Sequence, residues 1–197
     1  MNWLHQKIDE VFIRMKKEEF AMTVEDYHFP KEMIESEDPK NKSLKVWKPT
    51  PSTITDEELD ELESKISKKL PKSYREFLKY KFFNEFMLED YSIVFPSNLP
   101  NKAIPKLFEK TELFDGDLDS RGYIYFADFN DGGFLCFDTN QEREDNEYPV
   151  VMIDHEDTET PHLYAENFRD LLASDADRSN RFIEYLNEFD RKRWAKE

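Results

Sequence analysis

The negative charge of this 197-residue chain is concentrated in one stretch of sequence. Residues 112–166 hold sixteen acidic and two basic side chains, a net charge of −14, while the whole chain carries −16. No fold requires such crowding, because like charges on one surface repel each other and destabilise the compact state. The concentration indicates either an acidic surface that only keeps the protein solvated or one that attracts a cationic partner.

Apolar runs inside this acidic stretch have the pattern of β-strands. Residues 123–129 and 134–138 are rich in aromatic and aliphatic side chains, and the sequence Asn-Asp-Gly-Gly at 130–133 separates them. Asp-Gly between two apolar runs is typical of a hairpin turn, because glycine adopts positive φ at low cost. A charged loop over 139–147 leads to a third expected strand at 149–154. The acidic side chains are therefore expected in loops around this hairpin.

Helices are expected on both sides of the strands. Apolar residues recur every three or four positions in four segments, with Asn2 as N-cap of the first: 4–15, 59–66, 74–82 and 168–189. Thr55 and Glu58 have the spacing of a capping box, and Pro71 suits the first turn of the third segment. Helices, then strands, then helices favour an α+β fold with a mixed, largely antiparallel sheet.

The proline-rich segment 23–53 is expected to be a linker or a long wrapping segment, which Trp47 could pin to the domain surface. Proline pushes the residue before it out of the helical region, so Pro49-Thr50-Pro51 favours extended backbone. The predicted organisation is an N-terminal helix and extended linker over 1–50, followed by a domain with C-terminal helices over 51–197.

Composition narrows the class of protein. Seventeen Phe and nine Tyr supply enough large side chains for a core. No apolar run approaches the roughly 20 residues of a membrane-spanning helix, and the first residues lack the pattern of a signal peptide. The single cysteine, Cys136, excludes an internal disulfide framework. We therefore expect a cytoplasmic protein, and the net negative charge argues against nucleic acid or anionic lipid as a direct ligand.

Patterns of catalytic or metal-binding residues are mostly incomplete. The loop that begins at Asp115 lacks the Gly and Glu of a calcium loop at positions six and twelve, and the loop that begins at Asp128 has Thr139 instead of Glu at position twelve. His155 and His162, among several carboxylates, could form a metal or acid–base site, but an exposed loop explains them as well. Cys136 lies within an expected strand, where a small buried residue is a simpler interpretation than a nucleophile. We predict no enzymatic activity and no cofactor.

Several segments together resemble a known family. The segments are the acidic capped helix at 54–63, the sequence Leu-Pro-Lys-Ser-Tyr-Arg-Glu-Phe-Leu at 70–78, the hairpin strand at 133–138, the strand at 149–156 and the segment 164–172. Their order is that seen in the SUKH superfamily, the Smi/Knr-like domains. The resemblance covers roughly residues 54–172. It implies a compact α+β domain with helices packed on a mixed sheet. It also implies an immunity protein that neutralises a polymorphic toxin, often a nuclease; fungal relatives act as interaction hubs.

The acidic stretch and the resemblance lead to one hypothesis. A nuclease toxin has a cationic cleft, and an acidic surface can occupy it while opposite charge speeds the encounter. We expect a non-enzymatic immunity protein whose acidic loops bind such a toxin. The candidate partner-binding residues are Asp128, Asp131, Glu142, Glu144, Asp145, Glu147, Asp154, Glu156 and Asp157. A scaffold or regulator without a toxin partner, and a hydrolase that uses His155 and His162, are the alternatives.

Overall fold

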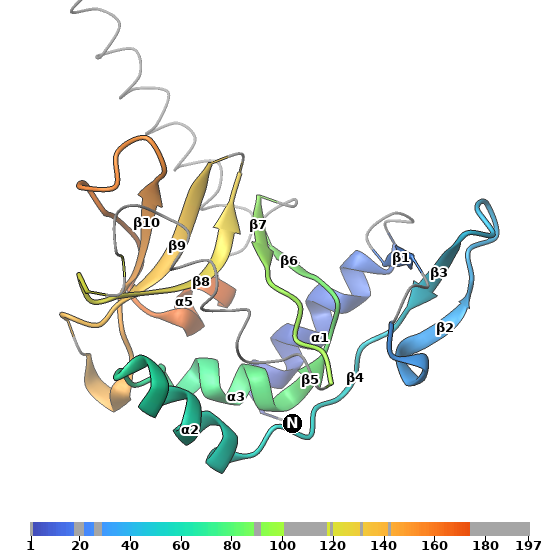
Figure 1. Cartoon of the computed structure of the whole chain (residues 1–197), viewed down its shortest axis with the longest axis horizontal. Helices are drawn as coiled ribbons and strands as arrows, with labels where there is room; N and C mark the ends of the chain where they lie inside the picture. The colour runs from blue at the N-terminus through green and yellow to red at the C-terminus, as the bar shows by residue number, and fades with distance from the viewer. Residues whose placement is uncertain are drawn as a thin grey trace, which may run out of the picture.

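A six-stranded antiparallel sheet forms the centre of the protein. The computed structural model describes residues 2–17, 22–25, 29–88, 92–100, 118, 120–130, 132–141 and 143–173 (Figure 1). The strands are β6 (Phe86–Leu88), β7 (Ile93–Phe95), β8 (Tyr123–Phe129), β9 (Gly133–Asp138), β10 (Val150–Asp154) and β11 (His162–Ala165). Their order is β11-β10-β9-β8-β7-β6, and every described pairing in it is antiparallel. The α+β prediction and the predicted β8–β9 hairpin are confirmed.

Helices α1 (Trp3–Met15), α2 (Asp56–Ile66) and α3 (Lys72–Tyr80) match three predicted helices closely. The Asn2 side chain accepts a hydrogen bond from the Leu4 amide, and the capping box of Thr55 and Glu58 is formed at the start of α2. Phe82 was expected on the face of α3, but that helix ends at Tyr80. Phe82 instead lies in β5 (Lys81–Phe82), which pairs with β4 (Thr50–Pro51).

The C-terminal part of the family-like region differs from the sequence prediction. His162 was expected in an exposed loop, but residues 162–165 form β11 at the edge of the sheet. Helix α5 (Phe168–Ala173) follows directly. The expected helical stripe at 182–189 lies outside the described residues.

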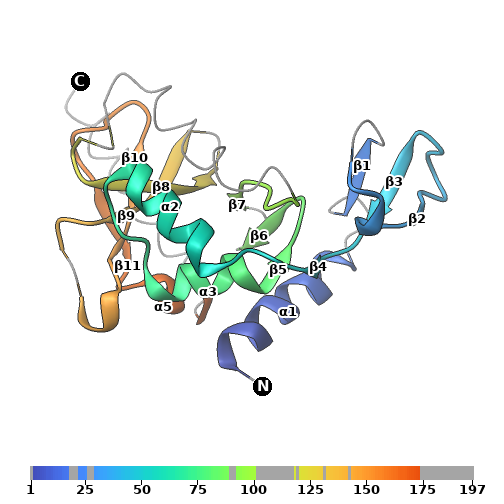
Figure 2. The same ribbon diagram turned by 60° about the horizontal axis from the view of Figure 1, so that its bottom comes forward.

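The segment expected to be a linker contains a small sheet. Strands β1 (Thr23–Glu25), β2 (Ile34–Glu37) and β3 (Leu44–Trp47) pair in the order β1-β3-β2, with the 3-10 helix η1 (Lys31–Met33) between β1 and β2. Figures 1 and 2 show this sheet at one side of the molecule, beyond an end of α1. Trp47 is fully buried and packs edge-on against Phe12 of α1, at 6.4 Å between ring centroids. The boundary at residue 50 stays a prediction, although Trp47 and α1 belong to the same apolar core as the large sheet.

Aromatic side chains dominate the core on the face of the sheet covered by α1, α3 and α5. Phe77 of α3 lies at its centre, with ring centroids 5.0 Å from Phe86, 5.3 Å from Phe168 and 5.4 Å from Phe95. The opposite face of the sheet carries a second, smaller apolar cluster: Leu118, Tyr123, Tyr125, Phe134, Cys136, Val151 and Ile153. The sheet is therefore apolar on both faces, which leaves its ends, its edges and the outer faces of the helices for charged side chains.

Replacing Phe77 with alanine tests the central position of this ring. We expect Phe77→Ala to lower the free energy of unfolding by about 3–5 kcal/mol, because it removes a fully buried ring and leaves a cavity among five other rings. Urea denaturation measures the change. The matched control is Ile13→Ala on the exposed side of α1, where Ile13 is 61% exposed, and we expect a change within about 0.5 kcal/mol. Equal losses in the two variants would contradict this description of the core.

Candidate functional site

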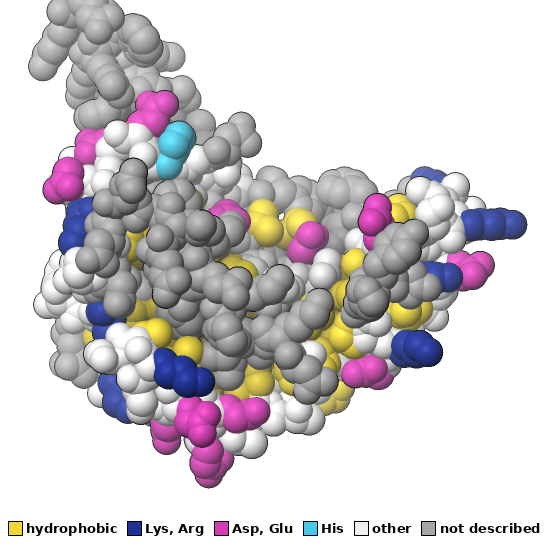
Figure 3. All heavy atoms as spheres, in the orientation of Figure 1, with side chains coloured by type: hydrophobic (Ala, Val, Ile, Leu, Met, Phe, Trp, Pro, Cys, Tyr) yellow, Lys and Arg dark blue, Asp and Glu magenta, His cyan; other side chains and the backbone are white. Residues whose placement is uncertain are grey.

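One end of the large sheet brings four predicted partner-binding residues together. Asp128 lies next to the end of β8, and Asp154 is the last residue of β10, with β9 between them. Glu156 and Asp157 follow Asp154 in the chain, and their side chains are exposed. We call Asp128, Asp154, Glu156 and Asp157 the hairpin-end acidic surface. Figure 3 shows acidic side chains gathered there, over the loop that follows β10.

Backbone hydrogen bonds fix the start of this loop. The His155 amide donates to the carbonyl oxygen of Gly132 at 3.0 Å, and Nδ1 of the His155 ring lies 2.7 Å from the same oxygen. A Cβ atom on residue 132 would lie 2.1 Å from that Nδ1, so the close approach requires glycine. The Glu156 amide donates to Oδ1 of Asp154 at 2.8 Å. The carboxylates of this surface therefore project from a backbone that the hairpin holds in place.

Asp128 also contributes to the second apolar cluster. The Tyr125 hydroxyl donates a hydrogen bond to Oδ1 of Asp128 at 2.8 Å. Burial raises the pKa of Tyr125, and the nearby negative charge of Asp128 raises it further. Asp128 is half-buried, so its carboxylate stands between the apolar cluster and the acidic loop.

The other predicted residues that the structure describes lie at the opposite end of the sheet. The 3-10 helix η2 (Glu144–Asn146) precedes β10, and the Arg143 amide donates to the Glu147 carbonyl across it at 2.7 Å. Asp145 and Asn146 have φ of 62° and 58°. Asp and Asn adopt left-handed backbone more readily than other residues with a Cβ. The sequence therefore permits a tight turn here, with Asp145 exposed.

Glu147 is buried, contrary to its expected place on an acidic surface. Its side chain is 8% exposed, and its two oxygens accept hydrogen bonds from the Ser73 amide at 2.8 Å and the Ser73 hydroxyl at 2.7 Å. Pro71, at the N-cap position of α3, offers no capping side chain, so Glu147 caps this helix from 74 residues further along the chain. We therefore remove Glu147 from the partner-binding set.

Burial raises the pKa of Glu147, while the Ser73 hydrogen bonds and the charges of Arg169 and Lys72 oppose that shift. Desolvation disfavours the carboxylate form, and the donors around it favour that form. The larger effect is desolvation, so the folded protein holds the proton of Glu147 more tightly than an exposed glutamate would.

Two of the predicted residues lie outside the described part of the chain, and one is described only in part. Asp131 and Glu142 belong to the first group. Glu144 is placed in η2 by its backbone alone. Their assignment to a binding surface stays a prediction.

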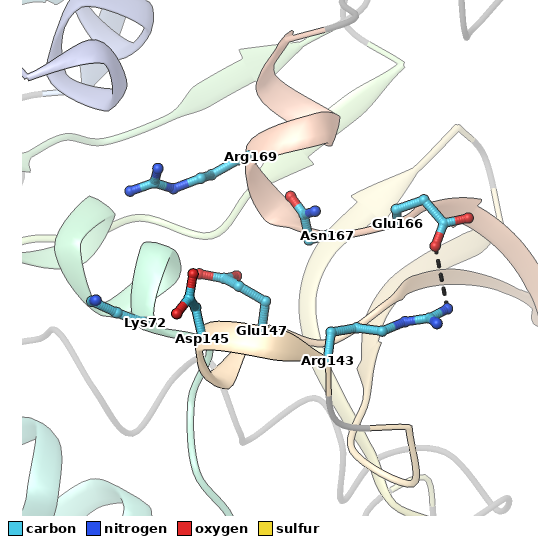
Figure 4. Close-up of a pocket in the computed structure, with 7 residues that line it drawn as sticks. All are labelled: Lys72, Arg143, Asp145, Glu147, Glu166, Asn167 and Arg169. Atoms are coloured by element: carbon cyan, nitrogen blue, oxygen red, sulfur yellow. Dashed lines mark ion pairs between the residues drawn. The ribbon is translucent and has the colours of Figure 1, made fainter.

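A cleft of about 460 Å³ lies between η2, the start of α3 and the junction of β11 with α5 (Figure 4). Its lining contains three basic and three acidic side chains and one asparagine: Lys72, Arg143, Arg169, Asp145, Glu147, Glu166 and Asn167. Nη2 of Arg143 lies 3.2 Å from Oε2 of Glu166. Positive and negative charges therefore balance among the side chains that line this cleft.

Sequence reasoning identified the acidic helix α2 but missed the ion pairs that it makes with α3; Figure 3 shows a second group of acidic side chains there, at the opposite side of the same view. Arg75 of α3 contacts Asp56 at 3.1 Å, Asp60 at 2.9 Å and Glu63 at 2.8 Å, and Lys79 contacts Asp56 at 2.6 Å. Burial acts to raise the pKa of Glu63, but hydrogen bonds from Lys69, Arg75 and the Leu70 amide together lower it. No local spacing in the sequence predicts these contacts between two helices.

Cys136, which the sequence offered as a possible nucleophile, is buried. Burial raises the pKa of the Cys136 thiol, which disfavours the reactive thiolate. Among the residues that the structure describes, no group of three or more His, Cys, Asp and Glu side chains is placed to hold a metal ion. None of the described helices is long and apolar enough to cross a membrane.

The family model described as the SMI1 / KNR4 family (SUKH-1) matches residues 53–174, more than half of the chain. The protein therefore belongs to the SMI1 / KNR4 family, and the resemblance identified from the sequence is confirmed. The match includes α2, α3, the large sheet and α5, whereas α1 and the small N-terminal sheet precede it. No curated protein matches the chain.

The buried cap of α3 predicts a pH dependence of stability. The pKa of Glu147 is higher in the folded than in the unfolded chain, so its stabilising contribution is complete below the unfolded value and falls as pH rises through the folded value. Glu147→Gln removes this titration. We therefore expect the variant to gain stability relative to the wild type as pH rises from about 4, near the pKa of an unperturbed glutamate, to about 7. Urea denaturation of both proteins across this range measures the difference in the free energy of unfolding.

The donor side of the same contact provides a control. Ser73→Ala removes the hydroxyl donor and leaves the buried carboxylate with one fewer hydrogen bond. We expect a loss of about 1–3 kcal/mol at neutral pH. A stability difference between wild type and Glu147→Gln that is constant with pH would contradict the raised pKa.

Proposed function

We propose that this protein is a non-enzymatic immunity protein that binds a cationic toxin domain through the hairpin-end acidic surface. Membership of the SMI1 / KNR4 (SUKH-1) family supports the general kind of protein. The partner, its nuclease chemistry and the surface that binds it are the proposed parts. Such a toxin attacks nucleic acid, so neutralisation would take place in the cytoplasm.

The observation that carries this proposal is the lack of ion-pair partners around the acidic loop. Glu156 and Asp157 are exposed and form no ion pair within the described part of the chain, and Asp154 has only the adjacent His155 ring at 3.5 Å. Asp56, Asp60 and Glu63 of α2 differ, because Arg75 contacts all three and Lys79 also contacts Asp56. Uncompensated charges on one surface create a field that extends into solvent, whereas paired charges largely cancel.

A nuclease toxin is the partner that this field fits best. Enzymes that cleave nucleic acid bind phosphates with Lys and Arg, so their clefts are cationic. A rigid acidic loop can occupy such a cleft, and opposite charge raises the association rate more than it raises affinity. The Gly132–His155 contact holds the loop before binding, so less conformational entropy is lost when the complex forms.

Charge reversal in the loop tests the surface. We expect the double variant Glu156→Lys/Asp157→Lys to associate at least about tenfold more slowly at low salt, with a smaller difference at high salt, because steering by opposite charge is lost and salt screens it. The measurement is the association rate, by stopped-flow fluorescence, with the cationic nuclease toxin domain that the proposal names as partner.

A second double variant controls for net charge. Glu57→Lys/Glu61→Lys makes the same change in total charge on the exposed side of α2, far along the chain from the loop. We expect it to slow association much less. Equal slowing by both variants would show that only the total charge matters, and unchanged rates in the loop variant would remove the hairpin-end surface from the mechanism.

A further inference from the structure

A row of apolar side chains crosses the large sheet and ends at its edge. Tyr125 of β8 lies opposite Cys136 of β9, Cys136 opposite Val151 of β10, and Val151 opposite Leu163 of β11. The first three side chains are at most 5% exposed, whereas Leu163 is 55% exposed. Directly opposed residues on neighbouring strands share one face of the sheet. The row is therefore buried over three strands and uncovered at the fourth.

Strand β11 is the outer strand at this side of the sheet, with β10 as its neighbour. An edge strand presents backbone groups that another extended chain can pair with, and proteins commonly block such edges with proline or lysine. The sequence of β11, His-Leu-Tyr-Ala, contains neither. Of the large apolar side chains in the described part of the chain, only Trp3 and Ile13, both on α1, are exposed to a similar extent.

Acidic side chains flank both ends of this edge. Glu156, Asp157 and Glu159 precede β11, Glu166 follows it, and all four are exposed. Glu166 pairs with Arg143 on the cleft side, while the first three make no ion pair in the described part of the protein. Because Glu166 is paired, an extended chain laid along β11 would meet uncompensated negative charge at the end next to the acidic loop.

Arg121 holds the loop that carries these carboxylates. Its Nη2 donates to the carbonyl oxygen of Thr158 at 2.7 Å, and its guanidinium lies over the ring of Tyr123 at 5.4 Å. Tyr123 belongs to the same apolar cluster as Val151. Arg121 therefore fixes the position of the acidic loop relative to the apolar cluster that contains Val151.

We propose that β11 binds an extended, cationic segment of the partner as a seventh strand of the sheet. An apolar side chain of that segment covers Leu163 and continues the row, and basic side chains at the end next to the acidic loop meet Glu156, Asp157 and Glu159. Main-chain hydrogen bonds give such strand addition its affinity, and alternate side chains give it specificity. This inference rests on the proposed function, because it names how the same cationic partner is held.

The probe is an alternating lysine–valine peptide about seven residues long, the length of an ordinary strand. We expect it to shift the amide NMR signals of β11 in the full chain and to slow hydrogen exchange there. The control peptide has the same sequence with N-methyl groups on alternate backbone nitrogens. It keeps the charge and the side chains, but it has no N–H donors along one of its two edges. We expect it to bind at least tenfold more weakly.

Two variants of this chain separate strand addition from attraction of charge alone. Leu163→Lys places a like charge at the uncovered end of the row, and Ile13→Lys makes the same change at an exposed apolar residue of α1. We expect the first to weaken binding of the lysine–valine peptide at least tenfold and the second to weaken it less than twofold. Thermal unfolding of both variants confirms that each remains folded.

Three results would overturn the inference. They are equal affinities for the two peptides, signal changes that map to α2 rather than β11, and no binding of the lysine–valine peptide at millimolar concentration. The proposed function fails by a different result, namely a toxin domain that the hairpin-end surface does not bind. If association with the toxin depends on Glu156 and Asp157 but not on Leu163, the proposed function stands and the strand-addition inference fails.

Discussion

The burial of one face of α3 is the constraint on which the rest of the domain depends. Tyr74 and Phe77 contact rings from the large sheet and from α5, so this helix fixes both against each other. Its outer face carries Arg75, which holds α2 through three carboxylates. Its first turn is capped by Glu147, which fixes the turn before β10. A single nine-residue helix therefore sets the positions of the acidic helix, the mixed-charge cleft and the start of a central strand.

These contacts divide the acidic residues by what surrounds them. Near α3, basic residues are within reach, so Asp56 is paired and Glu147 is drawn inside and protonated more readily. The loop after β10 lies at the other end of the sheet, where Glu156 and Asp157 have no such partners among the described residues. A charge that folding leaves uncompensated acts on other molecules, whereas a paired charge mainly acts within the fold. Position relative to α3 therefore separates Asp56 and Glu147, which are paired or buried, from the exposed carboxylates that the proposed function assigns to a partner.

Local patterns explain which features could be predicted from the sequence. The stripe of α1, the capping box at Thr55 and the β8–β9 hairpin depend on residues a few positions apart, and each was predicted correctly. Glu147 caps a helix 74 residues away, and no periodicity records that contact. Strand β11 is four residues long and follows a proline, which is too short for an alternating pattern. The small N-terminal sheet was missed because prolines suggested extended chain without pairing.

The acidic loop before β11 also opposes the pairing of this edge with a second copy in one orientation. If two copies of this chain met along β11 in parallel, the carboxylates of Glu156, Asp157 and Glu159 on one copy would approach the same carboxylates on the other. Like charges brought together in this way oppose association, which is one of the means by which proteins protect exposed edges. The same charges favour a strand that carries Lys or Arg. Repulsion between identical copies and attraction to a cationic chain are therefore two effects of one arrangement, in which an apolar edge position, Leu163, follows an acidic loop.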